Sequence, residues 1–322
     1  MGKSVYIGID VGSVSTNLAV IDDASQVLAV GYLPTQGQPI AAVQKGLRDV
    51  ALVLPQDATV RGVGATGSGR LLTRALVGAD IVKNEITAHA AATLRAVPDV
   101  RTIIEIGGQD SKIIVLNHGV VTDFAMNTVC AAGTGSFLDR QASRLGLDIA
   151  DLGRLALQAT KPTRIAGRCA VFAESDMIHK QQVGHSLADI VAGLCEALVR
   201  NYLNNVGKGK SIVSPVVFQG GVAANVGIRK AFEDALQLPI IVPPHYNVMG
   251  ALGACFLSQG VKGASAFRGF AVAEAHCQTA TSTCGGCGHL CEVVEFRMDR
   301  TAVAYWGDRC GRFGSKREKA GN

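Results

Sequence analysis

Short apolar segments separated by polar or glycine-rich turns run along most of the chain. Residues 5–10 form an apolar run that ends in Asp10, and a second run, residues 17–22, follows directly after a tight turn. Residues 27–33 continue this pattern as a third strand, and residues 40–52 then show the spacing of an amphipathic helix. This order of elements is typical of an α/β domain.

The opening pattern returns about one hundred residues later. Residues 102–106 form an apolar strand, residues 107–111 a polar turn, and residues 112–117 a return strand, which residues 120–126 follow as a third. Hairpins are common, so the spacing alone does not establish a repeat. The shared turn chemistry adds weight, and we predict two related halves.

Three glycine-rich turns carry candidate binding chemistry. The first follows Asp10, and the second contains Gln109 and Asp110. Both offer backbone N–H groups for phosphate oxygens and a carboxylate that can hold Mg²⁺ through water. The third turn, residues 219–225, is of a kind that lets a nucleoside lie flat against the backbone. The chain contains neither a P-loop nor a Rossmann glycine motif after a strand.

Two cysteines lie in unusual surroundings. Cys130 precedes the glycine-rich segment 133–136, and Cys169 follows Gly167 and Arg168. Each is predicted to lie near a helix N-terminus, where free N–H groups favour a thiolate or an anionic cluster. Two buried apolar thiols are the alternative. A 4Fe–4S cluster normally takes four thiolates, so two copies of the chain would have to share one.

A second group of cysteines lies near the C-terminus, at Cys277, Cys284, Cys287 and Cys291, with Cys310 as a spare. Cysteines spaced three and four apart, with glycines between them, favour metal binding over free thiols. A second Fe–S cluster and a structural Zn²⁺ both remain open. The segments 291–298 and 301–306 alternate like a hairpin, which predicts a small appendage. By contrast, Cys195 and Cys255 lie on apolar helical faces and are expected to be core residues.

Composition narrows the class further. Of 322 residues, 48% are hydrophobic and 18% charged, as in an ordered globular protein. The net charge of +5 is modest and its basic residues are scattered, which argues against nucleic-acid binding. The densest basic run, Arg309 to Lys319, is expected to be a solvated tail. No apolar run is long enough to span a membrane, and no leader is evident, so we expect a cytoplasmic protein.

These motifs resemble the actin-like ATPase superfamily, which also contains Hsp70 and the sugar kinases. With Cys130 and Cys169, the chain resembles the ATP-dependent activators of 2-hydroxyacyl-CoA dehydratases, a family that includes ATPase subunits of benzoyl-CoA reductases. The resemblance covers about residues 4–258. It implies two ribonuclease-H-like lobes, with a Cys-rich appendage as a departure from the family. The implied domains are lobe I (1–96), lobe II (97–246), a helix returning to lobe I (247–262) and the appendage (263–322).

The resemblance also implies roles for individual residues. Asp10 and Asp110 match acids that serve Mg²⁺ and the attacking water, with Gln109 beside them. Cys130 and Cys169 match the two ligands that each subunit gives to a shared 4Fe–4S cluster. Nucleotide binding is implied for Gly12, Ser13, Val14, Ser15, Gly107, Gly108, Gly133, Thr134, Gly220, Gly221 and Val222.

The implied activity is a one-electron transfer driven by ATP hydrolysis in a homodimer. Loss of the γ-phosphate contacts would change the lobes, and the helix that begins near Gly133 and Thr134 would carry that change to Cys130. A dehydratase or reductase component would accept the electron, and a ferredoxin or flavodoxin would supply it. A sugar or acid kinase is one competing hypothesis, but it leaves Cys130 and Cys169 unexplained. A non-redox ATPase switch or chaperone with a structural metal is another.

Overall fold

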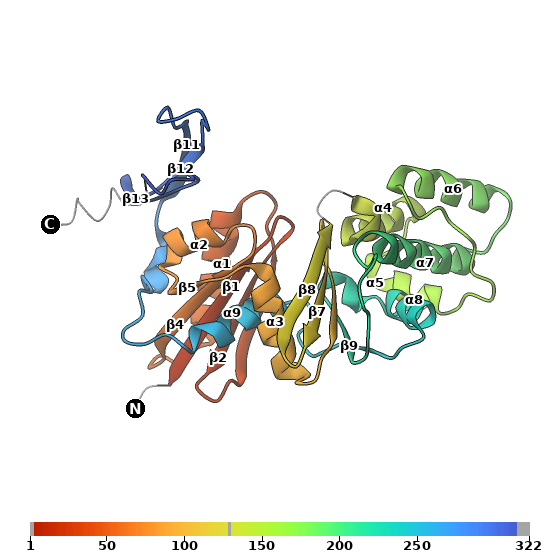
Figure 1. The fold of residues 1–322 in the computed structure, drawn as a ribbon, viewed down its shortest axis with the longest axis horizontal. Coiled ribbons are helices and arrows are strands. Elements are labelled where there is room, and N and C mark those ends of the chain that lie inside the picture. The colour runs from red at the N-terminus through yellow and green to blue at the C-terminus, as the bar shows by residue number, and fades with distance from the viewer. Residues whose placement is uncertain (1–2, 128–129, 314–322) are drawn as a thin grey trace. The chain divides into compact units, whose positions relative to one another are not determined.

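The computed structural model describes residues 3–127 and 130–313. The chain forms two compact units, one combining Met1–Ala88 with Gly250–Asn322 and the other consisting of His89–Met249 (Figure 1). Each unit has its own five-stranded sheet and its own hydrophobic core. The predicted basic tail extends past residue 313 and so lies largely outside the described residues.

The sheet of the first unit has the strand order β3-β2-β1-β4-β5. β1 pairs antiparallel with β2 and parallel with β4. Ile7 and Ile9 on β1 and Leu18 on β2 are fully buried, which explains the apolar runs at the start of the sequence. The strands are β1 (Ser4–Val11), β2 (Ser15–Asp22), β3 (Val27–Pro34), β4 (Thr59–Thr66) and β5 (Ile81–Val82).

Helix α9 (Met249–Ser258) approaches this sheet unusually closely. A Cβ atom on Gly8 would lie 1.9 Å from the Ala251 oxygen, and one on Gly64 would lie 2.2 Å from the Ala254 oxygen. Glycine is therefore required at both positions. The small residues of this helix thus allow its backbone to pack directly against the strands. The helices are α1 (Pro39–Val53), α2 (Arg70–Val77), α3 (Glu85–Ala96), which crosses into the second unit, and α9 (Met249–Ser258).

The sheet of the second unit repeats this topology in the order β8-β7-β6-β9-β10. Again the first strand, β6, pairs antiparallel with the second and parallel with the fourth. Two halves with one strand order confirm the repeat predicted from the sequence and the two-lobed α/β fold. The strands are β6 (Thr102–Ile106), β7 (Ser111–Asn117), β8 (Val120–Asn127), β9 (Val216–Gln219) and β10 (Ile240–Ile241).

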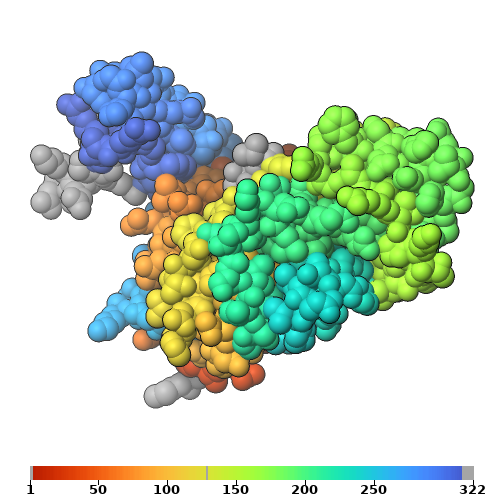
Figure 2. Space-filling model, turned by 45° about the vertical axis from the view of Figure 1, so that its right-hand side comes forward, coloured from red at the N-terminus to blue at the C-terminus, as the bar shows by residue number. Residues whose placement is uncertain are grey.

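A layer of helices completes the second unit. The surfaces of α7 and α8 adjoin in Figure 2, in green and cyan. Below that surface the ring of Phe232 meets Tyr202 and Phe218 edge-on, with centroids 5.4 and 5.3 Å apart. The helices are α4 (Gly135–Leu145), α5 (Ile149–Ala156), α6 (Ala170–Gln182), α7 (Leu187–Asn205) and α8 (Val226–Leu236), with 3₁₀ turns η1 (Ala131–Gly133) and η2 (Gly221–Ala224).

The Cys-rich appendage belongs to the first unit. A 3₁₀ turn, η3 (Phe270–Glu274), leads into a three-stranded antiparallel sheet of β11 (Cys277–Thr283), β12 (Glu292–Met298) and β13 (Thr301–Trp306). Phe296 is fully buried and joins the same core as Leu76. The predicted hairpin is confirmed, whereas β11 was missed because its side chains are mostly exposed and polar.

Among the residues that the structure describes, no helix combines the length and the hydrophobicity that crossing a membrane requires.

Candidate functional site

The first glycine-rich turn joins β1 to β2. The Gly12 nitrogen donates to the Ser15 oxygen at 2.9 Å, and the Thr35 hydroxyl donates to the Gly12 oxygen at 2.9 Å. Ser13 and Val14 at its tip are exposed. The turn is thus held in shape from below while its tip faces solvent, as a phosphate-binding loop requires.

Asp10 lies on β1 at the base of this turn, in register with Asn17 on β2 and Thr66 on β4. Paired residues on neighbouring strands share one face of a sheet, so three oxygen-bearing side chains form a row. Asn17 Oδ1 and Thr66 Oγ1 are buried and have no hydrogen-bond partner within the described residues. A hard cation such as Mg²⁺, with its waters, takes oxygen ligands of this kind, and the row therefore fits it.

The Asp10 carboxylate is also closely enclosed by backbone. A Cβ atom on Gly67 would lie 2.5 Å from Asp10 Oδ1, and one on Gly250 would lie 2.1 Å from Asp10 Oδ2. Gly250 belongs to the first turn of α9, where the helix dipole favours a negative charge. Two glycines and a helix start thus leave room for the Asp10 carboxylate.

The second turn joins β6 to β7. The Gly107 nitrogen donates to the Asp110 oxygen at 3.0 Å, which closes the turn, and Gln109 is exposed at its tip. Gly108 is half-buried. The two units therefore carry the same strand–turn–strand feature, each with an acid beside it.

Below the second turn lies a group of charges that sequence reasoning missed. The ammonium of Lys112 is buried and lies 2.9 Å from Glu105 Oε2 and 2.8 Å from Asp110 Oδ2. Glu105 is buried as well, whereas Asp110 is partly exposed. Lys112 thus holds the Asp110 carboxylate in place. The only sequence signal was a lysine at the start of an apolar strand.

The third turn follows β9. Gly220 has φ +89°, and a Cβ there would lie 2.3 Å from the Ile106 oxygen and 2.8 Å from Glu105 Oε1. Glu105 therefore lies beneath both the second and the third turn. Gly221 is exposed, but the Val222 side chain is buried in the core, so only the backbone of Val222 is available to a ligand.

Helix α4 is tied directly to the second turn. The Gly135 nitrogen donates to the Gly107 oxygen and the Ser136 nitrogen donates to the Gly108 oxygen, each at 2.8 Å. Gly133 and Thr134, just before the helix, are buried. Two backbone hydrogen bonds thus join the second turn directly to the first turn of α4.

Cys130 and Cys169 each immediately precede a helix, as predicted. Cys130 precedes η1 and α4, and Cys169 precedes α6. Asn127 fixes the first loop, accepting from the Cys130 nitrogen at 2.9 Å and donating to its oxygen at 2.8 Å. The Cys130 sulfur lies 4.0 Å from the oxygen of Arg168, the residue before Cys169. The fold thus brings the two cysteine loops together.

Asn201 on α7 links these loops and was also missed. Its buried side-chain amide donates to the Gly167 oxygen at 2.6 Å and to the Cys130 sulfur at 3.9 Å. Next to Cys169, Val171 and Phe172 are 66% and 69% exposed. The surface around the two cysteines is therefore partly apolar, and it is exposed in a single copy of the chain.

A salt bridge connects the two helices that follow these cysteines. Glu174 on α6 accepts hydrogen bonds from Arg140, at 2.9 Å, and from Arg144, at 2.6 Å, both on α4. Burial acts to raise the pKa of Glu174, but the two guanidinium groups outweigh it and hold that pKa below its ordinary value. The Glu174 side chain thus joins α4 to α6.

The C-terminal cysteines do not form the predicted group of four. Cys277 begins β11, whereas Cys284 follows its end, so the strand separates them by roughly 20 Å. Cys284, Cys287 and Cys291 share one loop, where the Cys284 nitrogen donates to the Cys291 oxygen at 2.8 Å. Within the described residues, no three His, Cys, Asp or Glu side chains are placed to hold a metal ion. Cys277 and Cys284 thus lie at opposite ends of β11, and metal binding by the C-terminal cysteines stays a prediction.

Two further thiols behave as predicted. Cys195 and Cys255 are fully buried on α7 and α9. Burial raises the pKa of Cys195 to about 12 and raises that of Cys255 even more. Both thiols therefore stay protonated and act as core residues.

The repeated lobes and their glycine-rich turns define an ATPase with the actin-like fold. A solved activator of the 2-hydroxyisocaproyl-CoA dehydratase from Clostridium difficile with bound ADPNP has a TM-score of 0.72 and 31% identity, covering 79% of this chain and 94% of that chain. The chain belongs to the BadF/BadG/BcrA/BcrD ATPase family, whose model matches residues 7–258.

Similar proteins support this assignment. The (R)-2-hydroxyglutaryl-CoA dehydratase activating ATPase of Acidaminococcus fermentans is 36% identical over 259 residues, which are 78% of this chain and 96% of that protein. The solved component A of that organism's dehydratase has a TM-score of 0.72 and 34% identity, covering 79% of this chain and 97% of that chain.

Proposed function

We propose that this ATPase activates a 2-hydroxyacyl-CoA dehydratase, or a related reductase component, by driving a one-electron transfer to it. The similarity to activators of 2-hydroxyglutaryl-CoA and 2-hydroxyisocaproyl-CoA dehydratases supports a partner of this class. The approach of the Cys130 and Cys169 loops within one chain is the observation that carries the redox part. A ferredoxin or flavodoxin is the proposed electron donor.

Cys130 and Cys169 would hold the cluster together with the same two residues of a second copy. One chain offers two thiols, which is half the donor set that a 4Fe–4S cluster normally takes. Exposed Val171 and Phe172 beside Cys169 supply apolar surface for the second copy. When bound, the cluster would act as the one-electron donor.

Nucleotide chemistry would take place at the glycine-rich turns. The backbone N–H groups of residues 12–15 and 107–108 would bind the phosphates, and Gly220 and Gly221 would meet the nucleoside. Asp10, with its row of oxygen-bearing neighbours, would hold Mg²⁺ through water, and Asp110 with Gln109 would orient the attacking water. Hydrolysis would add that water to the γ-phosphorus and release ADP.

The coupling would run along α4. Its first turn donates two hydrogen bonds to the carbonyl oxygens of Gly107 and Gly108, and its N-terminus follows Cys130. When contacts to the γ-phosphate are lost, the second turn would shift and α4 would move with it. A movement at this helix start changes the hydrogen bonds and solvent access around Cys130, two quantities that set the potential of a bound cluster.

Iron and sulfide stoichiometry of anaerobically purified protein tests this function. Wild type should carry about four irons per two chains above the content of the Cys130→Ser and Cys169→Ser variants. Cys310→Ser, a change at an exposed thiol, is the matched control and should keep this iron. An equal iron content in wild type and Cys130→Ser would contradict the ligand assignment and favour a kinase or a non-redox ATPase switch.

A further inference from the structure

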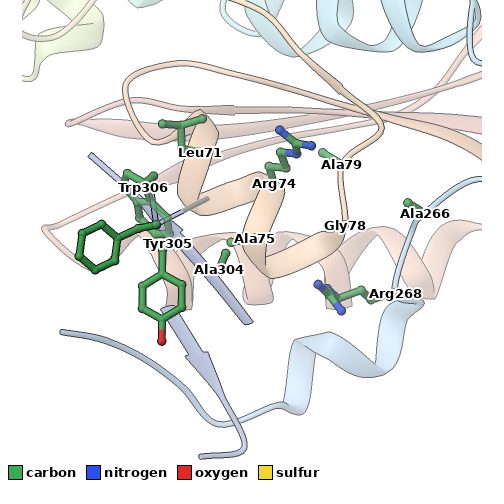
Figure 3. A pocket seen from close by; sticks show the side chains of 11 residues that line it. Leu71, Arg74, Ala75, Gly78, Ala79, Ala266, Arg268, Ala304, Tyr305 and Trp306 are labelled. Carbon is green, nitrogen blue, oxygen red and sulfur yellow. The ribbon is translucent and has the colours of Figure 1, made fainter. Parts of the chain in front are cut away.

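The first unit contains a cavity of about 360 Å³ between α2 and the appendage (Figure 3). Helix α2 and the residues just after it form one wall, and the end of β13 forms another. The family model ends at residue 258, so the cavity owes much of its lining to a segment outside the family match. Its lining residues are Leu71, Arg74, Ala75, Gly78, Ala79, Ala266, Arg268, Ala304, Tyr305, Trp306 and Phe313.

The segment that borders the cavity is fixed firmly to the first unit. Asp80 accepts from the Ser265 hydroxyl at 2.6 Å and from the Ala266 nitrogen at 2.7 Å. The Arg268 nitrogen donates to the Val77 oxygen at 2.9 Å. At Gly78, where φ is +74°, a Cβ would lie 2.2 Å from the Ala266 oxygen. The cavity is thus bounded by hydrogen-bonded backbone and is pre-formed.

Two kinds of side chain line this cavity. Tyr305, Trp306 and Phe313 contribute aromatic rings, and the rings of Tyr305 and Phe313 pack with centroids 6.3 Å apart. Arg74 and Arg268 contribute guanidinium groups, which Figure 3 shows on α2 and on the segment after residue 266. The Arg74 guanidinium makes no ion pair or hydrogen bond within the residues that the structure describes.

We propose that this cavity binds a small organic anion that carries a flat ring. Rings favour stacking with a flat apolar group, and guanidinium groups favour a carboxylate or a phosphate. Both oxygens of the neighbouring Asp80 carboxylate already accept hydrogen bonds, from residues 63, 265 and 266. The volume lies near the lower end of the range for small-molecule sites, so the ligand is no larger than a nucleoside monophosphate. This proposal does not depend on the electron-transfer function.

Trp306 provides a direct readout, because it is the only tryptophan of the chain and it lines the cavity. Its fluorescence should change saturably when the full-length protein is titrated with benzoate or with AMP, which represent carboxylate and phosphate ligands. The ligand that binds more tightly identifies the class of anion. Benzyl alcohol, a neutral ring, and inorganic phosphate, an anion without a ring, should each bind at least about tenfold more weakly.

The double variant Arg74→Gln/Arg268→Gln tests where the ligand binds. Both side chains are exposed, so the fold should persist, which circular dichroism checks. Binding should weaken by about tenfold or more, as expected when charge-assisted hydrogen bonds are lost. Arg154→Gln, an exposed arginine on α5, is the matched control and should bind as wild type. No saturable response with either ring anion, or an unchanged affinity in the double variant, would overturn the proposal.

Discussion

The side-chain nitrogen of Asn201 lies 3.9 Å from the sulfur of Cys130. The same amide donates to the Gly167 oxygen at 2.6 Å, two residues before Cys169. One buried side chain thus fixes the loops of both cysteines. Helix α7, which carries Asn201, is anchored in the core of the second unit, so the loops are positioned by a rigid element.

Asn201→Ala should lower the free energy of unfolding by about 1–3 kcal/mol, because it removes the buried amide that donates to the Gly167 oxygen. It should also shift the electron paramagnetic resonance signal and potential of the proposed cluster. Asn204→Ala removes an exposed amide from the same helix and is the control. If both variants unfold and titrate alike, Asn201 has no special role at the cysteine loops.

Phe172→Glu should convert the proposed dimer to a monomer. The side chain is 69% exposed beside Cys169, and a carboxylate placed in an apolar interface is costly to desolvate. Sedimentation velocity under anaerobic conditions measures the association. Leu52→Glu is the control. It changes a residue of the first unit that is 85% exposed, and it should leave the dimer intact. A dimer that persists in Phe172→Glu would place the shared surface elsewhere.

Phe296→Ala tests whether the appendage is part of the first unit. The side chain is fully buried with Leu76 and Val303, so its loss should cost about 3–5 kcal/mol in urea unfolding. Leu290→Ala, at a residue that is 62% exposed in the cysteine loop, should cost little. A separately folded appendage would instead give two transitions, of which the mutation moves only one. By the same reasoning, a chain cut near Gly260 should be destabilised.

The sequence predicted the features that depend on a pattern of neighbouring residues. The apolar runs around Ile7 and Ile104 gave the central strands, and the glycine context of Cys130 and Cys169 singled them out. The strand between two of the C-terminal cysteines could not be predicted in the same way. Cys277 and Cys284 are seven positions apart in the sequence, but β11 lies between them and places them at its opposite ends.

Contacts between residues that lie far apart in the sequence were also not predicted. Lys112 reads as an ordinary polar residue beside a strand, because the carboxylates that hold it become neighbours only when β6 pairs with β7. Asn201 lies in the middle of an apolar helix, and the groups that it contacts in the cysteine loops are thirty or more residues away along the chain. Such contacts are set by tertiary packing and leave no local periodicity.

Lys112→Met should be strongly destabilising, by about 3–5 kcal/mol, because it leaves the buried Glu105 carboxylate without its cation. The double variant Lys112→Met/Glu105→Gln removes that charge and should recover part of the loss. ATP hydrolysis should remain impaired in the double variant, since Asp110 still lacks the ammonium group that holds it. Urea unfolding and phosphate release measure the two effects. Equal stability of the single and double variants would contradict a coupled pair.

The Glu174 pair should make stability depend on pH in a defined direction. Because the pKa of Glu174 is lower in the folded chain than its ordinary value of 4.5, its carboxylate contributes stability above that value. The contribution is lost as the pH falls below 4.5 and through the folded-state pKa. Glu174→Gln should therefore be less stable than wild type at pH 7, by roughly 1 kcal/mol, and should approach it under acid conditions.

Glu292→Gln is the control for this comparison, because the exposed Glu292 side chain makes no ion pair within the described part of the chain. Its unfolding free energy should track that of wild type across the same pH range. A difference between Glu174→Gln and wild type that stays constant down to pH 3 would show that the effect is not electrostatic. The tie between α4 and α6 would then rest on packing around Ala173 and Met177 rather than on charge.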